Sequence, residues 1–252
     1  MQWWNEWKRR RVLKRHRIDE ALWRQIVLGL PFLGELDRED AVRLRELTLL
    51  FLFEKTFSGA RGLMLTDYMR VAIAAQACLL IRNLGLEWYD GWVGIVVYPG
   101  DFRVRRREVD DAGVVHEWDD ALAGESMPGG PVVLSWDTAA RAADMNVVIH
   151  EFAHKLDMRN GEADGLPPLH ADMDPRVWHT AFQAAYDGFR DGLERGRDTW
   201  LDPYAAEHPA EFFAVLSEAF FEWPQETRRR YPDVYDQLRC FYRQDPARLT
   251  PA

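Results

Sequence analysis

The chain has 252 residues, of which 47% are hydrophobic and 29% charged, and its formal net charge at pH 7 is −9. Length and composition fit one globular domain with a substantial core and exclude extended disorder. The acidic balance also argues against direct binding to nucleic acid, which draws mainly on clustered Lys and Arg.

The N-terminal segment, residues 1–25, is basic and rich in Trp, unlike the rest of the chain. Its first twenty residues hold seven cationic and three acidic side chains, namely Lys8, Arg9, Arg10, Arg11, Lys14, Arg15 and Arg17 against Glu6, Asp19 and Glu20. A charge run of this kind is usually the solvated face of a helix. The alternative is a surface for an anionic membrane or a partner protein, anchored by Trp3, Trp4 and Trp7. We expect a single domain over residues 26–252 after this segment.

Two helices are predicted in the first third of the chain. From Arg38 to Phe57 the apolar residues fall largely at helical spacing, and Ser58-Gly59 ends the run. The segment from Thr66 to Asn83 is also helical in pattern and poorer in charge, so this second helix is expected to be more deeply buried.

The cysteines and the apolar runs indicate the compartment. Cys78 lies inside the second predicted helix and far along the chain from Cys240, so a buried thiol is favoured over a disulfide. No apolar stretch approaches the roughly 20 residues of a transmembrane helix, and no signal peptide is recognisable. These features predict a cytoplasmic protein.

The pattern then changes from helices to short strands. The segment from Trp92 to Tyr98 is rich in Val and Ile and stops at Pro99-Gly100, which is typical of a buried strand. Further strands are predicted at Asp101–Arg105, at Val114–Trp118 and, more clearly, from Pro131 to Trp136.

Three more helices are predicted in the second half of the chain. They run from Arg141 to about Arg159, from Pro175 to about Arg195 and from Pro209 to Trp223. Asn160-Gly161 suits a left-handed cap after the first of them, and Pro209 suits the first position of the last. The order of helices, small sheet and helices predicts a single α+β domain.

The strongest chemical signal is the sequence His150-Glu151-Phe152-Ala153-His154, which matches H-E-x-x-H within a predicted helix. Histidines four residues apart project from one helix face, so both imidazoles can bind one Zn²⁺. Glu151, between them, is placed to act as a general base. The alternative is two core histidines with a structural acid.

Two neighbours of the motif fall near the same helix face. Asn146 precedes His150 by four residues and Asp157 follows His154 by three, so either could orient an imidazole through its second nitrogen. The alternative role for both is hydrogen bonding at the helix ends.

A catalytic zinc site needs a third protein ligand and leaves a fourth position for water. The short pattern H-E-x-x-H-x-x-G-x-x-H is absent, so the third ligand must come from further along the chain. The candidates are His170, His179, His208, Glu211 and Glu218. Glu211 begins the last predicted helix among apolar neighbours, and a buried carboxylate needs a cation. Its alternative role is a capping-box acid in the first helical turn.

Three segments in order, GPVVLSW at 130–136, HEFAHKLDMRNG at 150–161 and DPYAAEHPAEFFAVLSEAFF at 202–221, resemble the Mlc titration factor A family. Its members are bacterial zinc peptidases of the gluzincin type, and their catalytic core is similar to that of anthrax lethal factor. The resemblance runs from about Leu30 to the C-terminus and leaves the first twenty residues unmatched.

The resemblance implies a zincin-like metallopeptidase core with a small mixed sheet, an active-site helix bearing H-E-x-x-H, and flanking helices. It implies one Zn²⁺ per chain on His150, His154 and Glu211, and Glu151 as the catalytic base. Tyr204 corresponds to a tyrosine directed at the zinc-bound oxygen. The strand at 131–136 would be the edge strand that aligns an extended peptide substrate.

Two functions follow from the resemblance. Members of the family show aminopeptidase-like activity, and the namesake binds the transcriptional repressor Mlc. The first expectation is a zinc-dependent peptidase, with an aminopeptidase preference, that also binds a repressor of the Mlc type. The alternative is a binding protein that sequesters a regulator and whose peptidase activity is slow or incidental. A structural zinc site is disfavoured because such sites use four protein ligands.

Overall fold

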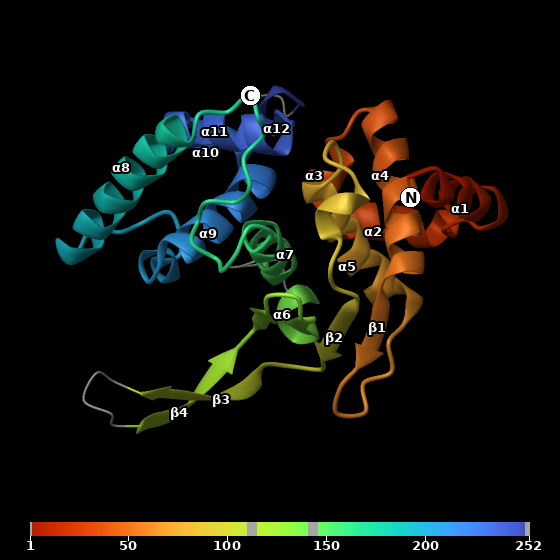
Figure 1. Cartoon of the computed structure of the whole chain (residues 1–252), viewed down its shortest axis with the longest axis horizontal. Helices are drawn as coiled ribbons and strands as arrows, with labels where there is room; N and C mark the ends of the chain where they lie inside the picture. Colours follow the sequence, from red (N-terminus) through yellow and green to blue (C-terminus); the bar gives the residue numbers. More distant parts are fainter. Residues whose placement is uncertain (1, 110–114, 141–145, 250–252) are drawn as a thin grey trace.

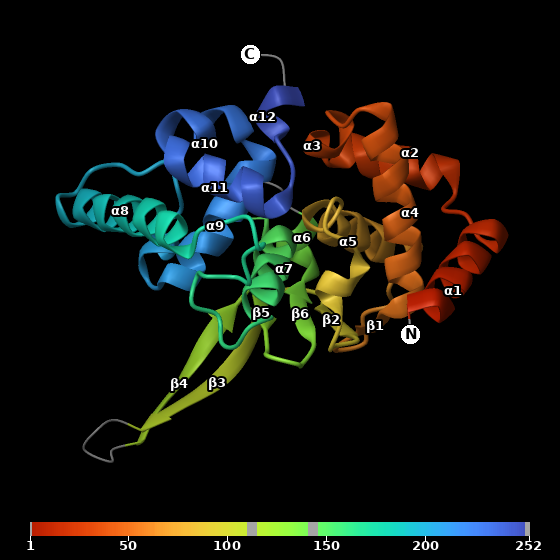
Figure 2. The ribbon, with the colours of Figure 1, turned by 45° about the horizontal axis from the view of Figure 1, so that its top comes forward.

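The computed structural model describes residues 2–109, 115–140 and 146–249, with the side chains of 7–102, 123–140 and 146–248 among them. Helices make up most of this part of the chain, with the bounds α1 Gln2–Arg15, α2 Glu20–Gly29, α3 Pro31–Gly34, α4 Arg38–Glu54, α5 Asp67–Leu80, η1 Leu86–Tyr89, α6 Trp136–Ala140, α7 Val147–Asp157, α8 Pro175–Glu194, η2 Pro203–Ala206, α9 Pro209–Glu222, α10 Pro224–Arg230, α11 Pro232–Tyr242 and α12 Pro246–Leu249. Helices α1–α5 lie on one side of α7 and helices α8–α11 on the other (Figure 1, Figure 2).

The main sheet has the strand order β1-β2-β6-β5, with the bounds β1 Thr56–Gly59, β2 Gly94–Tyr98, β6 Val132–Ser135 and β5 Gly124–Ser126. The first three strands are parallel, whereas β5 runs antiparallel to β6. The predicted α+β class with a small mixed sheet is therefore confirmed. The expectation that the strand at 131–136 forms the sheet edge is wrong, because β6 pairs on both sides. In the described part of the chain, the edge on this side of the sheet is β5, and β1 forms the opposite edge.

A second pair of strands, β3 (Phe102–Val109) and β4 (Val115–Leu122), forms an antiparallel ribbon that extends away from the helices (Figure 1, Figure 2). It connects β2 to β5. Strands were predicted at both places, although Val114 lies outside the described residues. At the base of the ribbon, Phe102 stacks on Tyr98 with ring centroids 4.8 Å apart.

The predicted helix from Arg38 to Phe57 is confirmed as α4, but its last residues are a strand. The helix ends at Glu54, Lys55 is extended, and Thr56 begins β1. Thr56–Gly59 pairs with β2, and these backbone hydrogen bonds to a distant strand outweigh the local helical pattern.

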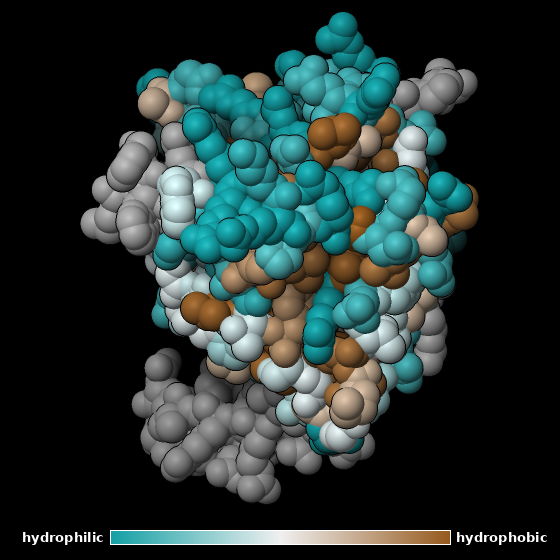
Figure 3. Space-filling model, turned by 90° about the vertical axis from the view of Figure 1, so that its right-hand side faces the viewer, coloured by the Kyte–Doolittle hydropathy of each residue, from teal (hydrophilic) through white to brown (hydrophobic). Residues whose placement is uncertain are grey.

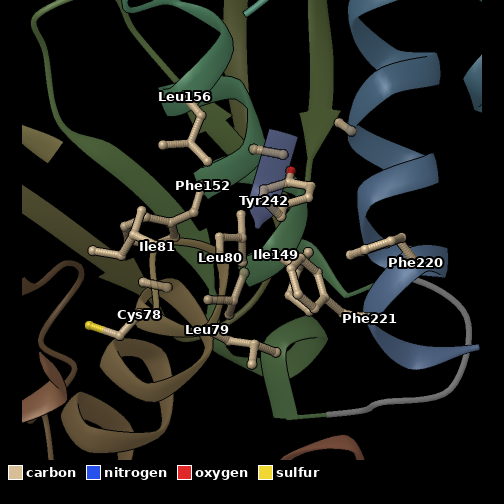
Figure 4. Packing of buried hydrophobic residues seen from close by; sticks show 14 of the residues in the cluster. Cys78, Leu79, Leu80, Ile81, Ile149, Phe152, Leu156, Phe220, Phe221 and Tyr242 are labelled. Atoms are coloured by element: carbon tan, nitrogen blue, oxygen red, sulfur yellow. The ribbon is translucent and has the colours of Figure 1, made fainter. Parts of the chain in front are cut away.

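The core lies where α5, α7 and the C-terminal helices meet. Thr66 caps α5 by accepting a hydrogen bond from Met69 N. Eleven of the fourteen residues of α5 are buried. Figure 4 shows side chains of α5, α7, α9 and α11 packed together, among them Leu80, Ile149, Phe220 and Tyr242. Cys78 is fully buried, and neither it nor Cys240 forms a disulfide, as expected.

The N-terminal segment is helical, as the charge run suggested, although Trp3 and Trp4 have no described side chains. Helix α1 packs against α4, and Val12 and Leu13 contact the main core. Hydrophilic residues cover much of this side of the molecule (Figure 3). Among the described residues, no helix combines the length and apolar character needed to cross a membrane.

Candidate metal centre

Helix α7 carries the H-E-x-x-H motif and is buried along its whole length. Asn146 begins the helix, since its side-chain oxygen accepts a hydrogen bond from Ile149 N at 3.1 Å. The predicted helix started at Arg141, but residues 141–145 lie outside the described part of the chain. His150 and His154 lie on one face of α7, and their Nε2 atoms are 3.1 Å apart.

Glu211 joins these histidines from the first turn of α9. Its Oε2 lies 2.9 Å from Nε2 of His150 and 3.3 Å from Nε2 of His154. The helix cap is made by His208, whose ring nitrogen accepts from Ala210 N, so Glu211 is not needed as a capping acid. Within the described residues, His150, His154 and Glu211 are the group of ligand atoms close enough to hold one metal ion.

The other third-ligand candidates do not belong to this group of ligand atoms. His170 donates from Nε2 to the carbonyl of Phe241 at 2.8 Å, and His179 is exposed on α8. Glu218 is buried beside His150, where it contacts the imidazole nitrogen that faces away from Glu211.

The ligand atoms of His150, His154 and Glu211 are placed so that they could bind one metal ion. Nδ1 of His150 donates to Oε1 of Glu218 at 2.8 Å, which leaves the lone pair of the neutral imidazole on Nε2. That lone pair faces Oε2 of Glu211 and Nε2 of His154. When His154 is the tautomer with its proton on Nδ1, all three atoms are acceptors, and at separations of 2.9–3.3 Å they repel one another unless a cation lies between them. Ligand atoms of a tetrahedral zinc site are about 3.3 Å apart, given bonds of about 2.0 Å.

The electrostatics of the cluster favour a cation. Burial alone would lower the pKa of His150, but hydrogen bonds to Glu211 and Glu218 raise it well above its ordinary value. Burial acts to raise the pKa of Glu211, and the two imidazoles overcome this and hold it far below its usual range. Glu211 is therefore ionised at neutral pH, and positive charge is stabilised between it and the histidines.

Glu151 occupies the adjacent face of α7, toward β5. It is 5% exposed, and its Oε2 has no hydrogen-bond partner among the described residues. Burial raises its pKa above the ordinary value. Ser126 of β5 donates from Oγ to the backbone carbonyl of Glu151 at 2.8 Å. The edge strand thus contacts the candidate base directly.

Tyr204, on the short helix η2 (Pro203–Ala206), lies beside His150. The backbone nitrogen of Tyr204 donates to Oδ1 of Asp202 at 2.8 Å, which fixes the start of this helix. The half-buried phenol ring lies with its centroid 6.3 Å from that of His150. The structure therefore brings together residues of α7, α9 and the short helix η2, namely His150, Glu151, His154, Glu211 and Tyr204.

The expected partners of the imidazoles differ from those in the structure. Glu218, rather than Asn146 or Asp157, binds the second nitrogen of His150. Asn146 binds Glu218 instead of the imidazole, since its backbone nitrogen donates to Oε2 of Glu218 at 2.6 Å. Asp157 instead accepts from Gly165 N at 2.8 Å. Glu218 follows Glu211 by seven residues, two helical turns, which is the sequence signal for a shared face.

Comparison with known proteins gives one family. The profile of the glucose-regulated metallo-peptidase M90 family matches residues 4–243. The chain is 39% identical over 236 residues to Mlc titration factor A of Yersinia pestis (strain Pestoides F). The aligned region covers 91% of this chain and 87% of that protein. The homologue from Yersinia pseudotuberculosis serotype O:3 (strain YPIII) gives the same values. The family match begins at residue 4, so the resemblance is not limited to the part after Leu30.

Proposed function

The chain belongs to the glucose-regulated metallo-peptidase M90 family, and from this premise we propose that it is a zinc-dependent peptidase with His150, His154 and Glu211 as metal ligands. The observation that supports the proposal most is the convergence of these three donor atoms beside the buried carboxylate of Glu151. Two imidazoles and one carboxylate form the ligand set of many catalytic zinc sites. One ion per chain is expected.

Zinc, when bound, supplies Lewis acidity and lowers the pKa of a coordinated water toward about 7. The protein's own residues move the protons. Glu151 takes the proton of the attacking water on a carboxylate oxygen and returns it to the leaving amine. Burial suits this role, because a raised pKa brings the carboxyl group closer to working pH. Tyr204 donates a hydrogen bond to the oxyanion of the tetrahedral intermediate.

We propose that a peptide substrate binds in extended form along the edge of β5. Among the described residues, strand β5 pairs only with β6, and it lies against α7, where Ser126 contacts Glu151. An extended peptide that adds to this edge is aligned by backbone hydrogen bonds. The preference for an N-terminal residue, that is, aminopeptidase specificity, is proposed from the family resemblance. The peptidase domain is proposed to span 26–252, with 1–25 packed on it through α1.

A second candidate function is the binding of a transcriptional repressor of the Mlc type in the cytoplasm. The relatives at 39% identity carry the name Mlc titration factor A, and this name motivates the candidate. The two functions are compatible, because a repressor that docks elsewhere leaves the cluster on α7 accessible. The alternative is a protein whose main role is to sequester the regulator, with slow hydrolysis.

Glu151→Gln separates these functions. The amide keeps the shape of the side chain and removes the proton acceptor, so zinc content and fold should persist while hydrolysis falls roughly 100-fold or more. Metal analysis and a screen of aminoacyl and peptide substrates measure both. Binding to a purified Mlc-type repressor should be unaffected. Full hydrolysis by zinc-loaded Glu151→Gln would refute the proposed mechanism.

A further inference from the structure

Lys155 is a buried cation that the proposed mechanism does not use. It follows His154 on α7 and is only 4% exposed. Its Nζ donates to the carbonyl of Met127 at 2.6 Å and to that of Gly130 at 2.8 Å. These carbonyls belong to the turn that joins β5 to β6.

The contacts of Lys155 belong to one face of α7. Val147, Glu151 and Lys155 are spaced four residues apart and therefore share this face. A Cβ atom added to Gly124 would meet the side chains of Val147 and Glu151, so the beginning of β5 lies on the first two turns of this face. Lys155 lies one helical turn after Glu151 on this face and contacts the residues that follow Ser126.

The turn itself is built around the carbonyl that Lys155 binds. Gly130 N donates to the carbonyl of Met127 at 3.0 Å, and Gly129 has a φ of +63°. The ammonium group binds both ends of this turn at once. Since β5 is only three residues long, its position depends on what holds its two ends.

Burying a lysine for this purpose costs free energy that an apolar side chain would not. No carboxylate in the described part of the chain forms an ion pair with Lys155, whose charge is met by carbonyl dipoles and by the ring of Trp92, with its centroid 4.9 Å from Nζ. Because a buried ammonium group costs free energy and this one binds two carbonyls of the turn, its contacts indicate that Lys155 holds the turn in place.

We propose that Lys155 is a positioning residue that holds the edge strand β5 at the distance from Glu151 at which an extended peptide can bind. The inference rests on the proposed peptidase function and on β5 as the substrate-binding strand. Lys155 does not touch the reacting atoms. It acts through the turn 127–130 on the strand that pairs with the substrate.

The chain offers a closely matched control in Lys55. Its Nζ donates to the carbonyls of Tyr89 and Trp92 at 2.5 and 2.7 Å, and it lies 3.9 Å from the centroid of the same Trp92 ring. Lys55 is also buried, and burial lowers its pKa to about 8. It has the same chemistry, but its partners belong to η1 and the loop before β2.

The experiment compares Lys155→Met with Lys55→Met in the full-length, zinc-loaded protein. For a long, internally quenched peptide, Lys155→Met should raise KM roughly tenfold, the effect of losing about one or two backbone hydrogen bonds, and lower kcat much less. Amide hydrogen exchange over residues 124–130 should become faster. Lys55→Met should lower thermal stability without either change. Lys155→Arg, which keeps a cation and its donors, should recover most of the KM.

The proposal is overturned if Lys155→Met and Lys55→Met raise KM equally, or if exchange over 124–130 stays at the wild-type rate in Lys155→Met. If Lys155→Met does not fold, Lys155→Gln replaces it, with a smaller change in the same direction expected because its amide keeps one donor group. If the zinc-loaded wild type cleaves no peptide, the proposed function fails, and the exchange rates alone still decide whether Lys155 holds β5.

Discussion

Gly124 lies so close to Glu151 that a Cβ atom at position 124 would stand 2.4 Å from Oε1 of the carboxylate and 2.6 Å from its Cγ. Contacts this short do not occur in folded proteins, so any side chain at position 124 displaces either the strand or the acid. The absence of a side chain here allows the edge strand to approach the candidate base.

We therefore predict that Gly124→Ala lowers kcat by roughly 100-fold while zinc content is retained, because it moves Glu151 and leaves the ligands in place. Steady-state kinetics and metal analysis provide the test. Gly188→Ala on α8 is the control, since a Cβ atom there meets nothing within 4 Å and the helix should be slightly stabilised. Normal kcat in Gly124→Ala would show that Glu151 is not held by this contact.

Glu211 and Glu218 should differ in their effect on zinc affinity. Glu211→Ala removes a proposed ligand, whereas Glu218→Ala removes only the carboxylate that orients His150 through Nδ1. We expect a 10- to 100-fold weaker zinc affinity for Glu218→Ala, the range for partners behind metal ligands, and a larger loss for Glu211→Ala. Competition with a chromophoric chelator measures both constants. Equal losses would leave the third ligand unassigned.

Tyr204→Phe tests the proposed oxyanion donor. The change removes the hydroxyl group and keeps the ring, whose centroid lies 6.3 Å from the centroid of the His150 ring. Loss of one such donor lowers kcat by roughly 100-fold or more, with little effect on KM. Zinc content should be unchanged. If kcat falls by less than about threefold, the hydroxyl group does not contact the transition state.

Glu222 should make the stability of the protein depend on pH. Burial, with repulsion from Glu218, raises its pKa from 4.5 to about 7 despite a hydrogen bond from Asn146. Between these values the folded chain binds more protons than the unfolded chain, so the free energy of unfolding falls as pH rises through this window. Glu222→Gln removes that penalty.

Glu222→Gln should therefore be more stable than the wild type at pH 8 by about 2 kcal/mol, discounted for the partial exposure of the side chain. The difference should shrink to well under half at pH 5. Urea denaturation of both proteins at the two pH values measures it. A difference that is the same at both would mean that Glu222 ionises normally in the folded state.

The sequence predicted most of the long helices and the motif on α7, because both depend on local periodicity and spacing. Val147 to Asp157 shows the apolar period, and His150 and His154 share a face in any helix. Glu211, 57 residues after His154, was one of five candidates for the third ligand on the residues alone, and only the family resemblance singled it out. In the structure, Oε2 of Glu211 lies 3.3 Å from Nε2 of His154.

Strands β1 and β5, which sequence analysis missed, are formed by backbone pairing with other strands. Strand β5 has only three residues, Gly124–Ser126, and no apolar alternation, so its backbone pairing with β6 is what makes it a strand. Because β5 was not predicted, β6 was expected to be the edge strand, whereas β5 lies outside it in the sheet. The role of Glu218 was missed for a related reason, since helical spacing gives the face but not the partner opposite it.

The division of the three donor atoms between α7 and α9 also affects the stability of the whole protein. An ion held by His150, His154 and Glu211 joins two points of the chain separated by helix α8 and its loops, much as a disulfide would. Unlike a disulfide, the ion binds only the folded chain, so each tenfold excess of free zinc over its Kd adds about 1.4 kcal/mol of stability. Zinc limitation would then lower the amount of folded protein as well as its activity.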